Sequence, residues 1–192
     1  MSYVLQRVIA AILLILLFPL LLGIALCCAL SSGVPVLFRG IRIGQNKKRF
    51  VIYKFRTMRE VASPMTEAQK QEMAQFGKLK EDPRVTCFGH FLRRFSLDEL
   101  PQLWNVVRND MALIGPRPIV DAEEVVYGRY STLIHSVKPG ITGLWQVSGR
   151  NLTTYHRRIA INRYYVRHRC WKLDLWIFCR TFVAVIGGRG AF

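Results

Sequence analysis

The sequence predicts a mainly helical α+β protein whose N-terminal membrane helix is broken near its middle. Three observations carry this prediction. Residues 8–30 form a run of 23 residues without a charge, and Pro19 lies inside it. Residues 49–58 alternate apolar and polar side chains, as a strand does. Several later stretches have helical patterns, and the last is amphipathic. We therefore divide the chain into a membrane element over residues 1–38 and one further domain over residues 39–192.

The apolar run is long enough to cross a bilayer, because a hydrocarbon core is about 30 Å thick. Pro19 lacks a backbone donor and clashes with the carbonyl of Ile15, so we expect a kink or break near Phe18. Each arm is then about 17 Å long, which suits a helix that enters the core and turns back. Basic residues on both sides of the run favour a hairpin with both ends on one face: Arg7, Arg39, Arg42, Lys47, Lys48 and Arg49. A kinked spanning helix is the alternative.

The elements after the membrane run begin with a basic turn over residues 40–48. A strand or hairpin arm follows over residues 49–58. Thr66–Phe76 has the pattern of a capped surface helix. Ser96–Val107 is a further helical stretch, and Pro101 should disturb its first turns.

The C-terminal half continues with Gly115–Pro118, which two prolines restrict to an ordered loop. Val125–Ser136 is predicted to be helical, and the two glycines of Ile141–Asn151, Gly143 and Gly149, suggest a binding loop. Residues 153–168 are strongly basic and interleaved with tyrosines. Residues 171–186 are apolar but interrupted by Asp174 and Arg180, so we expect an amphipathic helix that lies among lipid headgroups.

The charge distribution indicates anionic partners. The chain has 28 basic and 12 acidic residues, with no acid before Glu60 and only Asp174 after Glu124. This field would attract nucleic acid, anionic lipid or phosphorylated small molecules about equally. The five cysteines and four histidines lack the spacing of a disulfide framework or a zinc site, so we expect reduced cysteines that pack as apolar side chains.

Two readings of the segment that begins at Ser96 stay open. Ser96 and Glu99 fit a capping box, in which both side chains satisfy free amides at a helix start. Alternatively, the helix N-terminus and the nearby Arg93 and Arg94 keep Asp98 ionised and attract a phosphate towards it. An ionised aspartate can attack phosphorus and form an acyl phosphate. Mg²⁺, held by Asp98 and substrate phosphates, would be the metal.

Two arginines are candidates for phosphate binding. Arg117 lies between two prolines, which fix its backbone, and a guanidinium grips phosphate through two hydrogen bonds. Arg150 follows Gly149, which allows a ligand to approach the backbone closely. A surface turn is the structural alternative for Arg117.

Four motifs occur in the order and spacing of a known family, and together they cover nearly the whole chain: Tyr53-Lys54-Phe55-Arg56-Thr57-Met58, Ser96-Leu97-Asp98-Glu99-Leu100-Pro101-Gln102-Leu103, Gly115-Pro116-Arg117-Pro118 and Lys138-Pro139-Gly140-Ile141-Thr142-Gly143. The chain resembles the bacterial sugar transferase family, the monotopic polyprenol-phosphate phosphoglycosyl transferases. The stretch 143–150 and the terminal residues 190–192 resemble the catalytic domain of its hexose-1-phosphate transferases.

The resemblance implies a ping-pong reaction. Asp98 attacks the β-phosphate of a UDP-sugar and releases UMP, and polyprenol phosphate, such as undecaprenyl phosphate, then displaces the phosphosugar. Glu99 would assist through metal, proton or acceptor positioning. Arg117 and Arg150 match phosphate- and nucleotide-binding loops. Lys54 and Arg56 belong to a motif near the membrane, where we infer contact with the acceptor phosphate.

The resemblance also implies a location. Residues 1–38 would form a re-entrant hairpin, and residues 39–192 a catalytic domain on the cytosolic face of the bacterial inner membrane. The family usually breaks its helix at Ser-Pro, whereas this chain has Phe18-Pro19. The expected partners are membrane phospholipids, polyprenol phosphate and UDP-galactose or UDP-glucose, followed by an N-acetylated hexosamine. Nucleic acid is not expected, and a homodimer is left open.

Two other functions compete with this one. A non-catalytic membrane-bound module could bind nucleic acid or anionic lipid through its basic, tyrosine-rich C-terminal part. An enzyme that moves only the sugar would release UDP instead of UMP. The first alternative predicts that Asp98→Asn changes little, and the second is distinguished by the nucleotide released.

Overall fold

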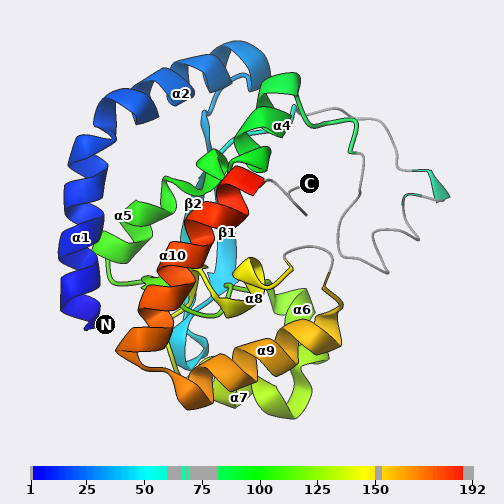
Figure 1. Ribbon diagram of the computed structural model, residues 1–192. Coiled ribbons are helices and arrows are strands. Elements are labelled where there is room, and N and C mark those ends of the chain that lie inside the picture. The colour runs from blue at the N-terminus through cyan, green and yellow to red at the C-terminus, as the bar shows by residue number, and fades with distance from the viewer. Residues whose placement is uncertain (1, 60–65, 68, 70–81, 150–152, 188–192) are drawn as a thin grey trace.

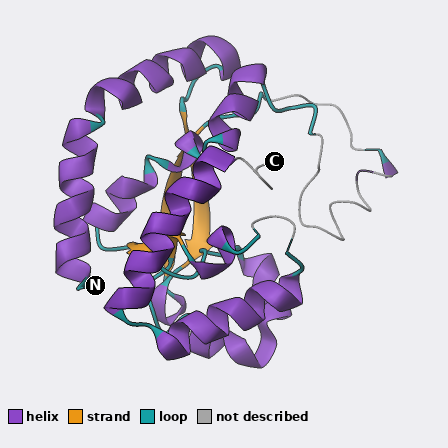
Figure 2. Ribbon diagram, in the orientation of Figure 1, coloured by secondary structure: helices purple, strands orange, loops and turns teal. Residues whose placement is uncertain are grey.

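The computed structural model describes residues 2–59, 66, 67, 69, 82–149 and 153–187. Helices make up most of the described chain, and the strands form two small sheets (Figure 2). The predicted α+β class is therefore confirmed. Helices α1 (Tyr3–Leu16) and α2 (Phe18–Ser32) form an arc along one side of the molecule (Figure 1). Three helices lie together at the end away from α2: α6 (Asp121–Tyr127), α7 (Ser131–Ile134) and α9 (Tyr155–His168). Most of the predicted helix Thr66–Phe76 lies outside the described residues.

The apolar run forms two helices, α1 (Tyr3–Leu16) and α2 (Phe18–Ser32). The pair bends by 65° at Leu17, and Pro19 occupies the first turn of α2, where its missing donor costs no helical hydrogen bond. The break predicted near Phe18 is thus confirmed. No single described helix has the length and hydropathy needed to cross a bilayer, while the bent pair together has both. Re-entry into a membrane stays a prediction.

One face of α1 is bound to the rest of the protein. Buried Gln6 accepts a hydrogen bond from the backbone N–H of Leu113 at 2.8 Å. Arg7 Nε donates to the carbonyl oxygen of Val107 at 3.1 Å. The side chains on the other faces are exposed and apolar, among them Val4, Val8, Ile12, Ile15 and Leu16. The helix therefore presents one face to the domain and leaves an apolar surface uncovered.

The predicted hairpin is confirmed. β1 (Leu37–Ile43) pairs antiparallel with β2 (Arg49–Phe55), from Leu37 opposite Phe55 to Ile43 opposite Arg49. The predicted turn over residues 40–48 is too long, because residues 40–43 continue the alternation of β1 and only 44–48 reverse the chain. Two basic residues of this region pair with acids of α6 (Asp121–Tyr127): Lys47 with Glu124 at 2.8 Å and Arg49 with Asp121 at 3.2 Å.

The segment predicted as one helix over Ser96–Val107 is divided. α4 (Cys87–Arg94) ends before Ser96, which adopts a left-handed conformation with φ 54° and ψ 24°. A single 3₁₀ turn follows over Leu97–Glu99, and α5 (Gln102–Val107) starts after Pro101. The side chain of Ser96 does not cap this turn, so the predicted capping box is wrong. The left-handed residue turns the chain sharply and places Asp98 inward.

Asn105 joins α5 to the hairpin. This residue is fully buried, and its Nδ2 donates to the carbonyl oxygen of Val51 at 2.7 Å. Its Oδ1 accepts from the N–H of Tyr53 at 3.2 Å. The two bonds fix the end of β2 that carries Lys54 against α5.

A second sheet pairs β3 (Ala112–Ile114) with β4 (Gly140–Thr142) in parallel. Gly115–Pro118 forms the predicted loop after β3. The binding loop predicted over Ile141–Asn151 is wrong over its first part, because β4 is followed by α8 (Leu144–Val147) with buried Trp145 and Val147. Residues 150–152 lie outside the described chain.

The helix predicted over Val125–Ser136 is interrupted at Gly128, which has φ 47°. The chain there forms α6, a 3₁₀ turn over Gly128–Tyr130 and α7 (Ser131–Ile134). A left-handed glycine ends a helix without steric cost, and the single predicted helix is therefore wrong.

The basic stretch forms α9 (Tyr155–His168), and α10 (Trp171–Gly187) follows. Asp174 is buried and accepts a hydrogen bond from Tyr165 at 2.8 Å, so it belongs to the core and not to the polar face expected for α10. All five cysteines are free, as predicted, but four are exposed and only Cys28 packs in a core.

Candidate active site

Three distant segments meet at one carboxylate. Glu99 lies in the 3₁₀ turn, Lys54 near the end of β2, and Arg117 in the proline-bracketed loop. Glu99 Oε1 accepts from Lys54 Nζ at 2.6 Å and from Arg117 Nη1 at 3.3 Å. The Lys54 and Glu99 side chains are 17% and 16% exposed, so water screens this pair little. The Lys54–Glu99–Arg117 cluster thus joins the two small sheets and the turn that carries Asp98.

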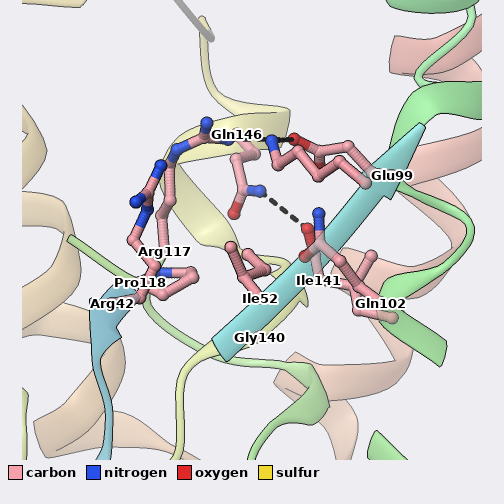
Figure 3. A pocket seen from close by; sticks show the side chains of 10 residues that line it. Arg42, Ile52, Glu99, Gln102, Arg117, Pro118, Gly140, Ile141 and Gln146 are labelled. Carbon is pink, nitrogen blue, oxygen red and sulfur yellow. Dashed lines mark hydrogen bonds and ion pairs between the residues drawn. The ribbon is translucent and has the colours of Figure 1, made fainter. Parts of the chain in front are cut away.

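This cluster forms part of the wall of a small pocket that is open to solvent (Figure 3). Seven further residues line the pocket: Arg42, Ile52, Gln102, Pro118, Gly140, Ile141 and Gln146. Sequence reasoning assigned no role to Arg42, Gln102 or Gln146. Gln102 lies in the motif Ser96–Leu103, and Gln146 lies in the stretch 143–150 that resembles the hexose-1-phosphate transferases. These two motifs could therefore have identified both glutamines. Arg42 had been placed only among the basic residues that flank the membrane run.

Asp98 lies beside this pocket, in the same turn as Glu99, and is 9% exposed. Burial raises its pKa from 3.8 to about 6, although Lys54, Arg93 and Arg117 act in the opposite direction. Neighbouring cations were expected to keep this carboxyl ionised; they lower its pKa as expected, but desolvation outweighs them. At neutral pH the carboxylate still predominates, and it is more basic than an exposed aspartate.

Glu99 behaves in the opposite way. Burial alone would raise its pKa, but Lys54 and Arg117 outweigh burial and lower the pKa from 4.5 to about 2. Glu99 is therefore a permanent anion at physiological pH. Adjacent carboxyls whose pKa values are pushed apart have distinct chemical capacities. Asp98 can act as a nucleophile or a ligand, and Glu99 holds two cations in place.

The other basic residues that were predicted to bind substrate differ in their relation to this site. Arg93 acts electrostatically on Asp98, and its Nε donates to Thr57 Oγ1 at 3.0 Å. Arg94 is exposed, with its guanidinium 5.6 Å from the ring centre of Phe95, and it does not line the pocket. Arg56 follows β2 and does not line the pocket. Arg150 lies outside the described residues.

The donor set can be compared with the needs of a magnesium ion. The described residues contain no group of three His, Cys, Asp or Glu side chains that could hold a metal. Glu99 is engaged by Lys54 and Arg117, which leaves Asp98 as the carboxylate at this site with ligand capacity. Mg²⁺ is often held by one or two carboxylates together with substrate phosphates, and Asp98 fits that mode.

Comparison with known proteins places this geometry in context. Residues 1–188 match the family model described as bacterial sugar transferase. The chain is 40% identical over 186 residues to the UDP-galactose-lipid carrier transferase of Erwinia amylovora, covering 92% of this chain but 38% of the relative. It is 39% identical over 191 residues to the exopolysaccharide production protein ExoY of Sinorhizobium fredii, covering 96% and 84%.

A third relative is the UDP-glucose:undecaprenyl-phosphate glucose-1-phosphate transferase of Xanthomonas campestris. The two chains are 39% identical over 195 residues, which cover 97% of this chain and 39% of the relative. The chain thus spans less than two-fifths of two of these relatives and most of the length of ExoY.

Proposed function

The chain belongs to the bacterial sugar transferase family, and on that premise we propose that it transfers a sugar 1-phosphate from a UDP-sugar to polyprenol phosphate, with release of UMP. Relatives named for UDP-galactose and for UDP-glucose with undecaprenyl phosphate support this donor and acceptor class. Galactose and glucose are our first choices for the sugar. The observation that carries the proposal is a buried, titratable Asp98 beside the cationic Lys54–Glu99–Arg117 cluster.

In the first half-reaction, a carboxylate oxygen of Asp98 attacks the β-phosphorus of the donor. The bond between that phosphorus and the bridging oxygen breaks, and UMP leaves with the bridging oxygen and its electron pair. A mixed anhydride of Asp98 and the sugar phosphate results. Lys54, Arg117 and Arg42 line the pocket and can bind the phosphate oxygens, whose charge they complement.

In the second half-reaction, an oxygen of polyprenol phosphate attacks the same phosphorus and the Asp98 carboxylate leaves. The product is a polyprenyl diphosphate sugar, and Asp98 is regenerated without net proton transfer. Mg²⁺ at Asp98 would neutralise part of the phosphate charge when bound. Glu99 acts by fixing Lys54 and Arg117, since both cations share its Oε1.

The proposed location follows from the apolar surface of α1 and α2. The chain would enter the bacterial inner membrane from its cytosolic face through α1, turn at Leu17, and return to the same face through α2. The 65° bend and the exposed side chains of α1 support a re-entrant, monotopic arrangement. The soluble donor and the lipid phosphate then meet on the same face. Transfer of a phosphosugar to the lipid phosphate would be an early, membrane-bound step of polysaccharide synthesis.

The nucleotide released decides between the proposed reaction and its alternatives. Purified protein is incubated with undecaprenyl phosphate, Mg²⁺ and a panel of UDP-sugars. We expect UMP, and a covalent phosphosugar on Asp98 when the acceptor is omitted. UDP as the nucleotide product would overturn the proposal. Asp98→Asn should lose UMP release but keep membrane binding, whereas Asp121→Asn, at an exposed ion pair, should keep both.

A further inference from the structure

Gln102 is a buried polar side chain that has no role in the reaction described above. It is 2% exposed and lines the pocket next to Glu99 and Lys54. Among the described residues, none forms a hydrogen bond with its carboxamide. Its amide atoms are not among the fully buried atoms without a partner, so they reach the open side of the pocket, where a ligand can pair with them.

Gln146 supplies a second carboxamide to the same pocket. Its Nε2 donates to the carbonyl oxygen of Ile141 at 2.8 Å, which fixes the amide, because a flipped amide would bring two oxygens together. Its Oε1 is buried and has no partner among the described residues. A Cβ added at Gly143 would lie 2.9 Å from this oxygen, so the glycine provides the space that the amide occupies. Figure 3 shows Gln102 and Gln146 approaching the pocket from different elements.

The unpaired atoms define the chemistry of the missing partner. The Gln146 oxygen can only accept, so its partner must carry an O–H or N–H, which the oxygens of an ionised diphosphate lack. Gln102 can both donate and accept, as a hydroxyl group does. The cations Arg42, Lys54 and Arg117 line the same pocket and complement phosphate. The pocket therefore combines a cationic part with a neutral, hydroxyl-binding part.

We propose that Gln102 and Gln146 bind hydroxyl groups of the donor's sugar and so determine which hexose is accepted. The assignment rests on the proposed function. One oxygen joins the sugar to the phosphorus that Asp98 attacks, whereas ribose and a second phosphate separate the uracil from it. Glu99, the neighbour of Asp98, forms part of the pocket wall. The part of the donor near this wall is therefore the phosphosugar.

A cycle of substrate and enzyme changes tests the assignment. Wild type, Gln102→Leu and Gln146→Leu are each assayed for kcat/KM of UMP release with the best UDP-hexose and its 2-, 3-, 4- and 6-deoxy analogues. For wild type, kcat/KM should be about 5- to 150-fold lower with at least one analogue than with the parent sugar, which is the range expected when a buried polar group loses its partner. The corresponding Leu variant should lose a similar factor with the parent sugar and little more with that analogue.

Gln45→Leu is the matched control. Gln45 lies in the hairpin turn and donates to the carbonyl oxygen of Ser136 instead of lining the pocket, so this variant should discriminate among the donors as wild type does. Gln102→Asn, which keeps an amide one methylene shorter, is used in the same cycle if a Leu variant does not fold.

Two results would overturn the sugar assignment. The first is a loss of kcat/KM in the Leu variants, relative to wild type, that is equal for the parent sugar and for all deoxy analogues. This result would mean that the amides bind phosphate or have only a structural role. The second is full activity of both Leu variants with the parent sugar. Either result leaves the proposed function intact as long as wild type releases UMP. If wild type releases no UMP from any UDP-sugar, the proposed function itself fails.

Discussion

Replacing Lys54 by Met tests whether this cation controls the ionisation of Asp98. Burial raises the pKa of Asp98 to about 6, and Lys54 is the strongest of the cations that oppose this rise. A carboxyl with a raised pKa is mostly protonated, and therefore unable to attack phosphorus, below that pH. In wild type the rate of adduct formation should thus rise about tenfold per pH unit up to about pH 6 and then level off.

Loss of the cation removes a charge that favours the carboxylate, so the pKa of Asp98 must rise further. An opposite charge within about 4–6 Å lowers the pKa of a carboxyl by about 1–3, and Arg93 and Arg117 remain in Lys54→Met. We therefore expect the pKa of Asp98 to rise by about 1 or more, from the lower end of that range of shifts. The acidic limb of the profile, and with it the pH at which the rate of adduct formation levels off, should then move to about pH 7 or above. The plateau rate should fall as well, because Lys54 also lines the pocket.

The assay is a single turnover with a radiolabelled UDP-sugar and no acceptor, so that only the first half-reaction is observed. The fraction of protein carrying the covalent phosphosugar is followed between pH 5 and pH 9, and each profile is normalised to its own plateau. Lys54→Arg keeps the charge and should keep the limb near that of wild type. An unchanged limb in Lys54→Met, with a lower plateau only, would refute the electrostatic role of Lys54.

Three further predictions concern the frame of the site. Asn105→Leu leaves two buried backbone groups of β2 without partners, and should lower the free energy of unfolding by about 2–4 kcal/mol in chemical denaturation; an effect below about 1 kcal/mol would contradict the role of Asn105. Gly143→Ala places a Cβ 2.1 Å from the carbonyl oxygen of Gly115 and should cost about 1–3 kcal/mol or more, whereas Gly23→Ala, with nothing within 4 Å, should not destabilise the thermal unfolding transition. Pro19→Ala supplies the N–H that a continuous helix would need and removes the ring that would clash with the carbonyl of Ile15 in such a helix, so the bend of 65° should straighten in part. Cysteine-accessibility labelling should then detect a fraction of N-termini on the opposite membrane face, and unchanged labelling would show that other contacts set the bend.

Features set by local chemistry were predictable from the sequence. A proline inside an apolar run predicted the break between α1 and α2, and alternation over residues 49–58 predicted β2. Two prolines around Arg117 predicted an ordered loop. In each case the steric or hydrogen-bonding restriction acts within a few residues, so the rest of the fold has little power to override it.

Features that depend on distant contacts were not predictable in this way. Lys54, Glu99 and Arg117 meet only because β2, the 3₁₀ turn and the loop after β3 fold together, and the motifs indicated only that they act in one site. The glycines of Ile141–Asn151 suggested a binding loop. In the structure Gly143 instead permits close packing, since a Cβ there would lie 2.1 Å from the carbonyl oxygen of Gly115. Burial likewise decides the pKa of Asp98, and no pattern within Ser96–Glu99 encodes burial.

Two buried amides connect the apolar N-terminal arm to the site. Gln6 of α1 bonds to the backbone of β3, and β3 leads directly into the loop that carries Arg117. Asn105 of α5 bonds to the backbone of β2 on both sides of Ile52, and Lys54 lies close by on the same strand. Helix α1 also packs against α5. The two cations that bind Glu99 are therefore positioned by strands that are anchored to α1 and α5. If α1 and α2 enter the bilayer as proposed, the pocket is held at a fixed depth relative to the lipid phosphates, and a soluble donor and a lipid acceptor can reach the same carboxylate in turn.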